Sequence, residues 1–283
     1  MKKAFLLITI QFCFEFVNAQ SQAGILDSSF GTNGVVAAFP QGGDGSIVIQ
    51  PDGKIVVGGT TYDGPDFSVV RYNSAGSVDY GFGANGIATA EIGLGYNSAR
   101  DLALQPDGKI LFAGSCVDFN GKWSFALIRF NSNGSLDNSF SGDGKLITSF
   151  NDFSYADYGQ AVAVQPDGKI IEVGMSNDNS AVRGFGIVRF NADGSPDMTF
   201  GNGGKLVIPI GNAYPAATAV IVQPDLKILV CGYSSSNFQS SFALMRLNSN
   251  GTLDNSFGAG GKDTAYFGGA GSNGEGDLYE NST

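Results

Sequence analysis

The sequence contains no histidine among its 283 residues, and only 15% of its residues are charged. Without histidine, a Ser-His-Asp triad, a zinc centre built on histidine and a histidine general base are all excluded. The nine prolines and 42 glycines follow no every-third-residue pattern, which excludes collagen and proline-rich linkers. A hydrophobic content of 42% excludes a disordered chain. What remains is a folded protein rich in glycine and phenylalanine.

The first 19 residues have the pattern of a cleaved secretory signal peptide. Lys2 and Lys3 precede the apolar run 4–10, and residues 17–19 form a small-residue cleavage signal. A membrane anchor is excluded because this run is far shorter than the roughly 20 apolar residues that a span needs. We therefore expect a secreted protein, extracellular or periplasmic, without membrane insertion.

The charge balance is acidic, with 26 acidic against 16 basic residues and a formal net charge of −10. Such a surface repels nucleic acid and anionic lipid, so neither is expected as a main partner. Beyond the expected signal peptide the chain has two cysteines, Cys116 and Cys231, which occupy non-equivalent positions of the repeat described below. This placement favours two separate small apolar residues over a disulfide. We expect no metal and no cofactor.

Three short signatures recur in a fixed order along the chain. The first, Gln-Pro-Asp-Gly-Lys, starts at Gln50, Gln105, Gln165 and, with Leu226 in place of glycine, Gln223. The second, Phe-x-apolar-apolar-Arg-x-Asn, starts at Phe67, Phe125, Phe185 and Phe242. The third, Asp-x-x-Phe before a glycine-rich turn, starts at Asp27, Asp79, Asp137, Asp197 and Asp254. The chain therefore consists of four full repeats and the opening of a fifth.

The hydrophobic pattern within each repeat is that of β-strands, and each unit reads as four of them. In the first unit these are residues 35–39, 46–50, 54–60 and 67–73. Pro-Asp-Gly between the second and third strands predicts a tight hairpin. Leucine at a positive φ costs about 1 kcal/mol or more, so Leu226 is expected to change the type of the fourth hairpin.

Consecutive antiparallel strands at a fixed period, apolar on both faces, are typical of propeller blades. We predict an all-β fold, a β-propeller of about four four-stranded antiparallel blades, over residues 20–267. The repeats span about 26–77, 78–135, 136–195 and 196–252, with a partial copy at 253–267. The tail 268–283 shows no core pattern and is expected to be disordered.

The same residues resemble a known family. The run 253–258, Leu-Asp-Asn-Ser-Phe-Gly, the Gln-Pro-Asp-Gly-Lys-Ile turn and the Phe-x-x-x-Arg-[Tyr/Phe]-Asn strand are similar to the delta-60 repeat of bacterial secreted and surface β-propeller proteins. The resemblance implies a β-propeller in an exported bacterial protein. It implies no catalytic residues, because the family is defined by a structural repeat.

The repeated aspartates could bind calcium, since oxygen-rich loops suit that ion. The loops lack the dense alternation of acidic residues found in calcium loops, however, and a single Asp before Ser or Thr commonly caps a turn. We therefore favour capping, with the four repeated arginines pairing with these aspartates or with backbone carbonyls.

Strand order places the signature turns on one rim and the variable loops on the other. Repeat proteins generally vary on the face that binds. Loops that drift freely in solvent are the alternative. We predict a non-catalytic binding or scaffold module for a protein or carbohydrate partner, with the lone tryptophan as its hot spot. The candidate binding residues on the variable rim are Tyr62, Asp118, Trp123, Tyr158, Arg183 and Tyr214.

The competing function is a carbohydrate-active enzyme, a glycoside hydrolase or lyase, built on the same ring. Paired carboxylates hydrolyse glycosides, and Asp118, Asp157 and Glu172 are the candidates. Glu172 stands where the other repeats have Val57, Phe112 and Val230. We expect an exposed outer-strand position for it rather than a buried acid with a raised pKa. No spacing singles out a pair, so our main expectation is that the chain is not an enzyme.

Closure of the ring is left open by the sequence. The partial fifth copy holds one candidate strand, residues 264–267. This strand could complete the last blade or pair beside the first strand. An open ring could also self-associate, or the sequence could be a fragment of a longer array of repeats.

Overall fold

The computed structural model describes residues 24–37, 45–61, 67–150, 156–177, 183–211, 215–236 and 239–265. The expected signal peptide and disordered tail lie outside these residues. In the described part of the chain, no helix is long and apolar enough to cross a membrane.

The strands form four antiparallel sheets of four, which confirms the predicted blades. The first blade consists of β1 (Ser46–Ile49), β2 (Ile55–Thr60), β3 (Phe67–Tyr72) and β4 (Ile87–Ala90). The second consists of β5 (Asn97–Leu104), β6 (Ile110–Val117), β7 (Trp123–Phe130) and β8 (Lys145–Thr148). The third consists of β9 (Tyr158–Val164), β10 (Ile170–Asn177), β11 (Arg183–Phe190) and β12 (Lys205–Ile208). The fourth consists of β13 (Ala216–Val222), β14 (Ile228–Ser236), β15 (Gln239–Leu247) and β16 (Lys262–Ala265).

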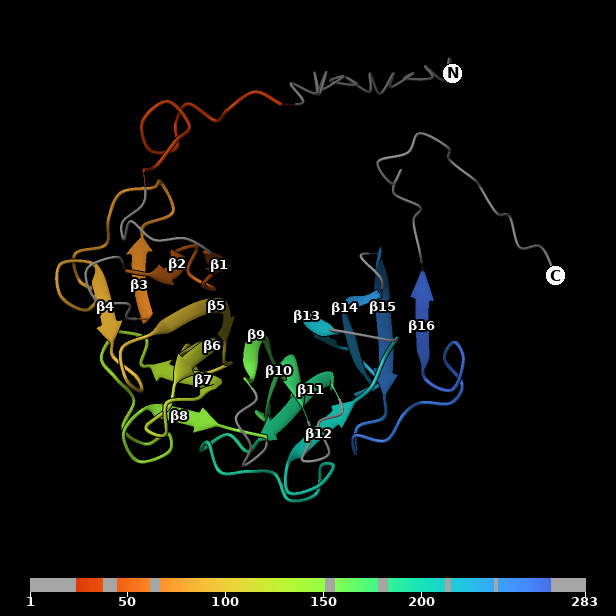
Figure 1. Ribbon diagram of the computed structural model, residues 1–283. Helices are drawn as coiled ribbons and strands as arrows, with labels where there is room; N and C mark the ends of the chain where they lie inside the picture. The colour runs from red at the N-terminus through yellow and green to blue at the C-terminus, as the bar shows by residue number, and fades with distance from the viewer. Residues whose placement is uncertain are drawn as a thin grey trace, which may run out of the picture.

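The blades stand side by side around an axis, with the first strand of each on the inside and the fourth on the outside (Figure 1). The inner strands pack in series, β1 against β5, β5 against β9 and β9 against β13. No comparable packing joins β13 to β1 among the described strands, and Figure 1 shows the ring open between them. The four blades therefore form an open ring.

Each blade begins one strand later than the four-strand unit expected from the sequence, so the expected grouping of strands is wrong. The expected first strand of each unit is the outer strand of the preceding blade, as β8 pairs with β7. The reason is local: Asp137 N donates to Arg129 O and Arg129 N donates to Gly144 O, so the turn folds back on the strand just completed. The residues expected to open the first unit therefore lie before blade 1, where Val35 forms only an isolated bridge with Thr32. The partial fifth copy completes the last blade as β16.

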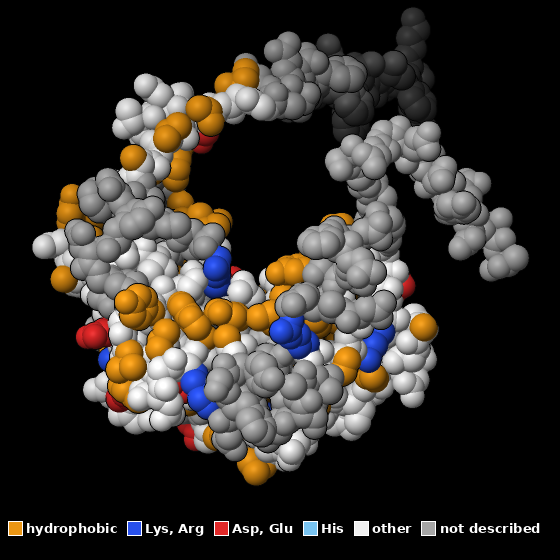
Figure 2. All heavy atoms as spheres, viewed as in Figure 1, with side chains coloured by type: hydrophobic (Ala, Val, Ile, Leu, Met, Phe, Trp, Pro, Cys, Tyr) orange, Lys and Arg blue, Asp and Glu red, His pale blue; other side chains and the backbone are white. Residues whose placement is uncertain are grey.

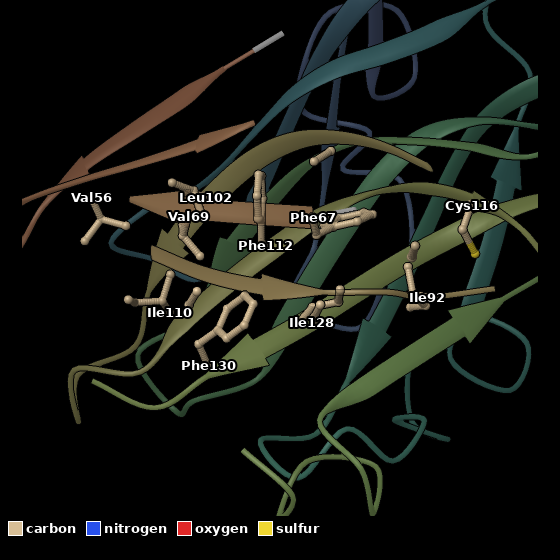
Figure 3. Packing of buried hydrophobic residues seen from close by; sticks show 14 of the residues in the cluster. Val56, Phe67, Val69, Ile92, Leu102, Ile110, Phe112, Cys116, Ile128 and Phe130 are labelled. Atoms are coloured by element: carbon tan, nitrogen blue, oxygen red, sulfur yellow. The ribbon is translucent and has the colours of Figure 1, made fainter. Parts of the chain in front are cut away.

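The hydrophobic core consists of layers between neighbouring blades. Between the first two, Phe67 of β3 meets Phe112 of β6 edge to face, with ring centroids 5.2 Å apart, and Val69, Leu102 and Ile128 surround them (Figure 3). Full burial of one such side chain contributes about 1.5–3 kcal/mol. Equivalent clusters join blades 2 and 3 and blades 3 and 4. Each inner blade is thus apolar on both faces.

The repeated polar residues form one network per blade, which confirms their predicted structural role. Arg129 Nε donates to Asp137 Oδ2 at 2.7 Å, and its guanidinium lies 4.4 Å from the centre of the Phe140 ring. Asp137 Oδ1 accepts from the Ser139 amide and hydroxyl, and Lys109 reaches the other oxygen at 3.3 Å. Burial alone would raise the pKa of Asp137, but these hydrogen bonds and the Arg129 charge outweigh it and lower the pKa to about 2.

The fourth Gln-Pro-Asp turn keeps the geometry of the others, so the expected change of turn type is wrong. Leu226 has a φ of 64° and its N–H donates to Gln223 O at 2.9 Å, as that of Gly53 does to Gln50 O. The turn tolerates the strain because the Lys227 amide is also held by Asp225.

Replacing Leu226 with glycine is expected to raise the free energy of unfolding by about 1 kcal/mol, the cost of a left-handed leucine. Chemical denaturation measures the change. Gly168→Leu, at the equivalent position of blade 3, is the reverse control and is expected to lower stability. A destabilised Leu226→Gly variant would contradict the strain assigned to this turn.

Arg189→Ala is expected to cost about 3–5 kcal/mol of unfolding free energy, because it breaks the buried ion pair with Asp197 and leaves Lys169 as the cation bound to that carboxylate. Arg246→Ala is the matched control. Arg246 is more exposed than Arg189 and donates to no carbonyl of a following blade among the described residues, so its loss is expected to be smaller. Equal losses in chemical denaturation would show that the contact with the next blade contributes nothing.

Candidate functional site

The loops opposite the signature turns carry the residues that the sequence singled out. Trp123 begins β7, Tyr158 begins β9 and Arg183 begins β11. Asp118 lies in the turn between β6 and β7. Tyr62 and Tyr214 fall outside the described residues.

Trp123 and Tyr158 meet across the junction of blades 2 and 3. Their ring centroids are 5.5 Å apart at an interplanar angle of 37°. The Asp157 amide donates to Trp123 O at 2.9 Å, which ties the start of β9 to β7. Both rings are partly buried. They form an aromatic pair on the variable face, the one close grouping among the predicted binding residues that the structure describes.

The two predicted carboxylates of these loops are occupied by the backbone. Asp118 Oδ1 accepts from the amides of Asn120 and Lys122, both at 2.9 Å, and so caps the β6–β7 turn. Asp157 is fully buried and accepts from the Ser176 hydroxyl at 2.6 Å and the Phe150 amide at 2.9 Å. Such hydrogen bonds fix loops and leave little accepting capacity for chemistry.

Glu172 is buried, so the expected exposed position is wrong. It lies on β10, the second strand of its blade, where it pairs with Val162 and Val188 and is only 1% exposed. Burial raises the pKa of its carboxyl well above the usual value, although the Gly114 backbone donates to it. Oε1 has no partner in the described structure. A carboxyl enclosed between two blades cannot reach a polysaccharide.

A groove that the sequence did not reveal lies between the segment that follows β4 of blade 1 and strand β8 of blade 2. It has a volume of about 700 Å³. Three carboxylates, a lysine and an exposed phenylalanine line it: Glu91, Asp118, Asp143, Lys145 and Phe119. Glu91 is exposed and forms no hydrogen bond or ion pair with the described residues, whereas Asp143 accepts from the Lys145 amide. The available signal was that the other repeats have Ser149, Pro209 and Tyr266 where this one has Glu91.

The described residues contain no group of three or more acidic or cysteine side chains that could hold a metal ion. Both described cysteines are free, Cys116 buried and Cys231 exposed. Burial and the nearby Asp118 raise the pKa of the Cys116 thiol to about 12, so it stays protonated.

Three solved structures are similar to this chain. A protein of unknown function from Dyadobacter fermentans is 14% identical with a TM-score of 0.48, covering 79% of this chain and 64% of its own. An α-L-arabinofuranosidase from Lactobacillus brevis is 10% identical with a TM-score of 0.47, and the match covers 78% of this chain and 71% of that protein's chain. A thermostable family-43 glycoside hydrolase is 13% identical with a TM-score of 0.45, covering 79% and 74%.

These findings correct two expectations. Two of the three similar structures are named as enzymes that act on glycosides, which runs against a non-catalytic binding module and against the expectation that the chain is not an enzyme. The names remain those of the similar proteins and are not transferred to this chain.

Glu172→Gln is expected to stabilise the protein as the pH rises. The folded pKa of Glu172 lies above its unfolded value of 4.5, so its contribution is complete below that value and is lost as the pH increases. Glutamine does not titrate, so the two proteins should melt alike near pH 4 and diverge by pH 8. Glu91→Gln, at an exposed position, is the control. Parallel melting curves at every pH would contradict the burial of Glu172.

The sequence matches the model of a domain of unknown function, the DUF5122 beta-propeller, at residues 50–82, 105–140, 165–200 and 223–257. Each match begins at the glutamine of the first signature and ends at the phenylalanine of the third. No curated protein matches the sequence. The repeated matches agree with the blades of the structure. The repeated matches therefore support a β-propeller repeat family for this chain.

Proposed function

We propose that this protein is a carbohydrate-active enzyme, a glycoside hydrolase or lyase, whose site is the groove between blades 1 and 2. The observation that carries the proposal is the joint presence of three carboxylates and an exposed aromatic ring in one surface groove. Glycoside cleavage needs one carboxylic acid to protonate the leaving oxygen and a second carboxylate to assist attack. A lyase needs a base beside the sugar ring.

Glu91 is assigned the proton-transfer role because its carboxylate is exposed and has no partner among the described residues. Asp143 is the second carboxylate: one oxygen accepts from the Lys145 amide and the side chain is exposed. Asp118 is retained as the cap that holds the adjoining turn. Lys145 on β8 supplies positive charge for an acidic sugar.

Aromatic rings on either side of the β6–β7 turn are assigned to substrate binding. Phe119 is 76% exposed at the groove, and Trp123 with Tyr158 forms the pair beyond it. Flat apolar surfaces with a polar edge suit the faces of sugar rings. Arg183 at the start of β11 is exposed on the same face and is proposed to contact a charged substrate.

The delta-60 resemblance and export through a signal peptide belong to the same proposal. Both rest on the sequence, on the signatures at Gln50 and Leu253 and on the run of residues 1–19. An exported enzyme would meet polysaccharide outside the cell.

The test is an assay of the purified chain against a panel of neutral and acidic polysaccharides, following reducing ends and unsaturated products. Product formation is expected, with about a hundredfold or greater loss in Glu91→Gln and Asp143→Asn, the scale of general acid–base catalysis. Asp263→Asn on β16 is the control, since this carboxylate is exposed outside the groove. Trp123→Ala is expected to raise KM and leave kcat unchanged. Absence of product from every substrate, with the fold intact, would overturn the proposal.

A further inference from the structure

The face of blade 4 that points into the opening of the ring is built like a blade interface but is uncovered. Phe242 on β15 is 66% exposed, whereas Phe67, Phe125 and Phe185, at the same repeat position, are fully buried. In blade 1, Phe67 is buried by the next blade, where it meets Phe112. Blade 4 thus exposes the side chain that the other three blades bury.

The neighbours of Phe242 on this face are exposed as well. Tyr233 pairs with Phe242 and Cys231 with Leu244, and Ile221 lies beyond them on β13. Ile221, Cys231 and Tyr233 are all exposed. A hollow of about 410 Å³ lies at Phe242 and Tyr233. Figure 2 shows the opening as a hollow with hydrophobic side chains along its inner edge.

The polar network of blade 4 stops at the same boundary. In each earlier blade the arginine Nη1 donates to a carbonyl of the following blade: Arg71 to Ser132, Arg129 to Ala192 and Arg189 to Ser249. Arg246 keeps its pair with Asp254 but donates to no such carbonyl among the described residues. The neighbouring Gln223 Oε1 is buried and has no partner there either.

On the other side of the opening, the described residues before blade 1 form the outer turn of a blade and none of its inner strands. The loop from Asp27 folds like the later copies, since Gly34 N donates to Phe30 O as Gly86 N does to Phe82 O. This loop also contacts blade 1, because Gly31 N donates to Ala75 O. Two later loops, between β3 and β4 and between β7 and β8, contact the blade that follows them in the same way.

Asp27 nevertheless lacks the arginine that every later copy has, and among the described residues its carboxylate binds only Ser29. On β1 of the adjoining blade, Ile47 is 62% exposed, whereas Leu102, its equivalent on β5, is 4% exposed.

We propose that the opening is a docking site for a three-stranded antiparallel β-meander of this repeat type, presented by a second polypeptide. Its apolar faces would cover Phe242 and Tyr233 on one side and Ile47 on the other. The arginine of its third strand would pair with Asp27, and the turn after that strand would offer a carbonyl to Arg246. Each of the sixteen described strands already belongs to one of the four blades, so none of them can fill the opening. The docked meander would form two further blade interfaces, one at each end of the open ring. Their contacts would have the same chemistry as those of the three interfaces already present.

The exposed thiol of Cys231 lies on the docking face and reports its occupancy. The test uses the full chain with Cys13→Ser, which leaves buried Cys116 and exposed Cys231. The probe is a polypeptide of this chain's residues 158–194, the strands β9–β11 and their turn, which contains no cysteine. At a probe concentration ten times the Kd, labelling of Cys231 is expected to slow by about tenfold.

Two variants locate the contact. Phe242→Asp and Asp27→Ala are each expected to remove the protection, whereas Phe119→Asp, a matched exposed phenylalanine away from the opening, is expected to keep it. Protection that survives both substitutions would place the probe elsewhere and overturn the proposal.

A covalent version removes the dependence on a free peptide that could fail to fold. Residues 149–194 are joined after Ala265, so that the meander comes after β16 as β9 comes after β8. This chain is expected to melt at a higher temperature and to hide Cys231. A reactive Cys231 in the folded, extended chain would refute the docking site. Concentration-dependent dimers that hide Cys231 without any probe would assign the face to a second copy instead.

Discussion

The ion pair between the arginine of the third strand and the aspartate of the next turn holds each blade together. Arg129 and Asp137 are both more than nine-tenths buried, and each charge compensates the other there. The same guanidinium lies over Phe140 and donates to Ala192 of the next blade. One side chain therefore fixes the turn, sets the path of the outer strand and joins two blades, and the apolar layers form on the frame that it provides.

This network also decides where reactive groups can lie. The repeated lysines, arginines and aspartates neutralise one another on the signature face, as Lys109, Arg129 and Asp137 do. Only charged side chains that occur in a single repeat remain available to act on a substrate. Of these, Glu172 is enclosed between blades, whereas Glu91 faces a groove. A unique charge matters for function when solvent and substrate can reach it.

The strands and the capping aspartates could be predicted because they depend on local signals that recur four or five times. The assignment of each outer strand to its blade could not be predicted. Residues 87–90 could pair with β3 or begin the next sheet, and backbone hydrogen bonds such as that from Arg71 N to Gly86 O decide between the two. Leu226 at positive φ likewise reflects a turn held by its neighbours against local preference. The groove escaped prediction because Glu91, Asp118 and Asp143 come from three separate loops.

A propeller blade is stable only with neighbours on both faces, and each end of this open ring lacks one neighbour among the described strands. The phenylalanine that is fully buried in three blades is largely exposed in the fourth, although the backbone around it keeps the same pairing. Local signals are therefore sufficient to form the strand, and only burial distinguishes an inner blade from a terminal one. Because Arg246 and Asp27 each retain half of a blade contact, the open ends preserve the specificity of the interface together with its apolar surface. Apolar area alone would accept many partners, whereas an arginine and an aspartate at fixed positions select a strand that carries their complements.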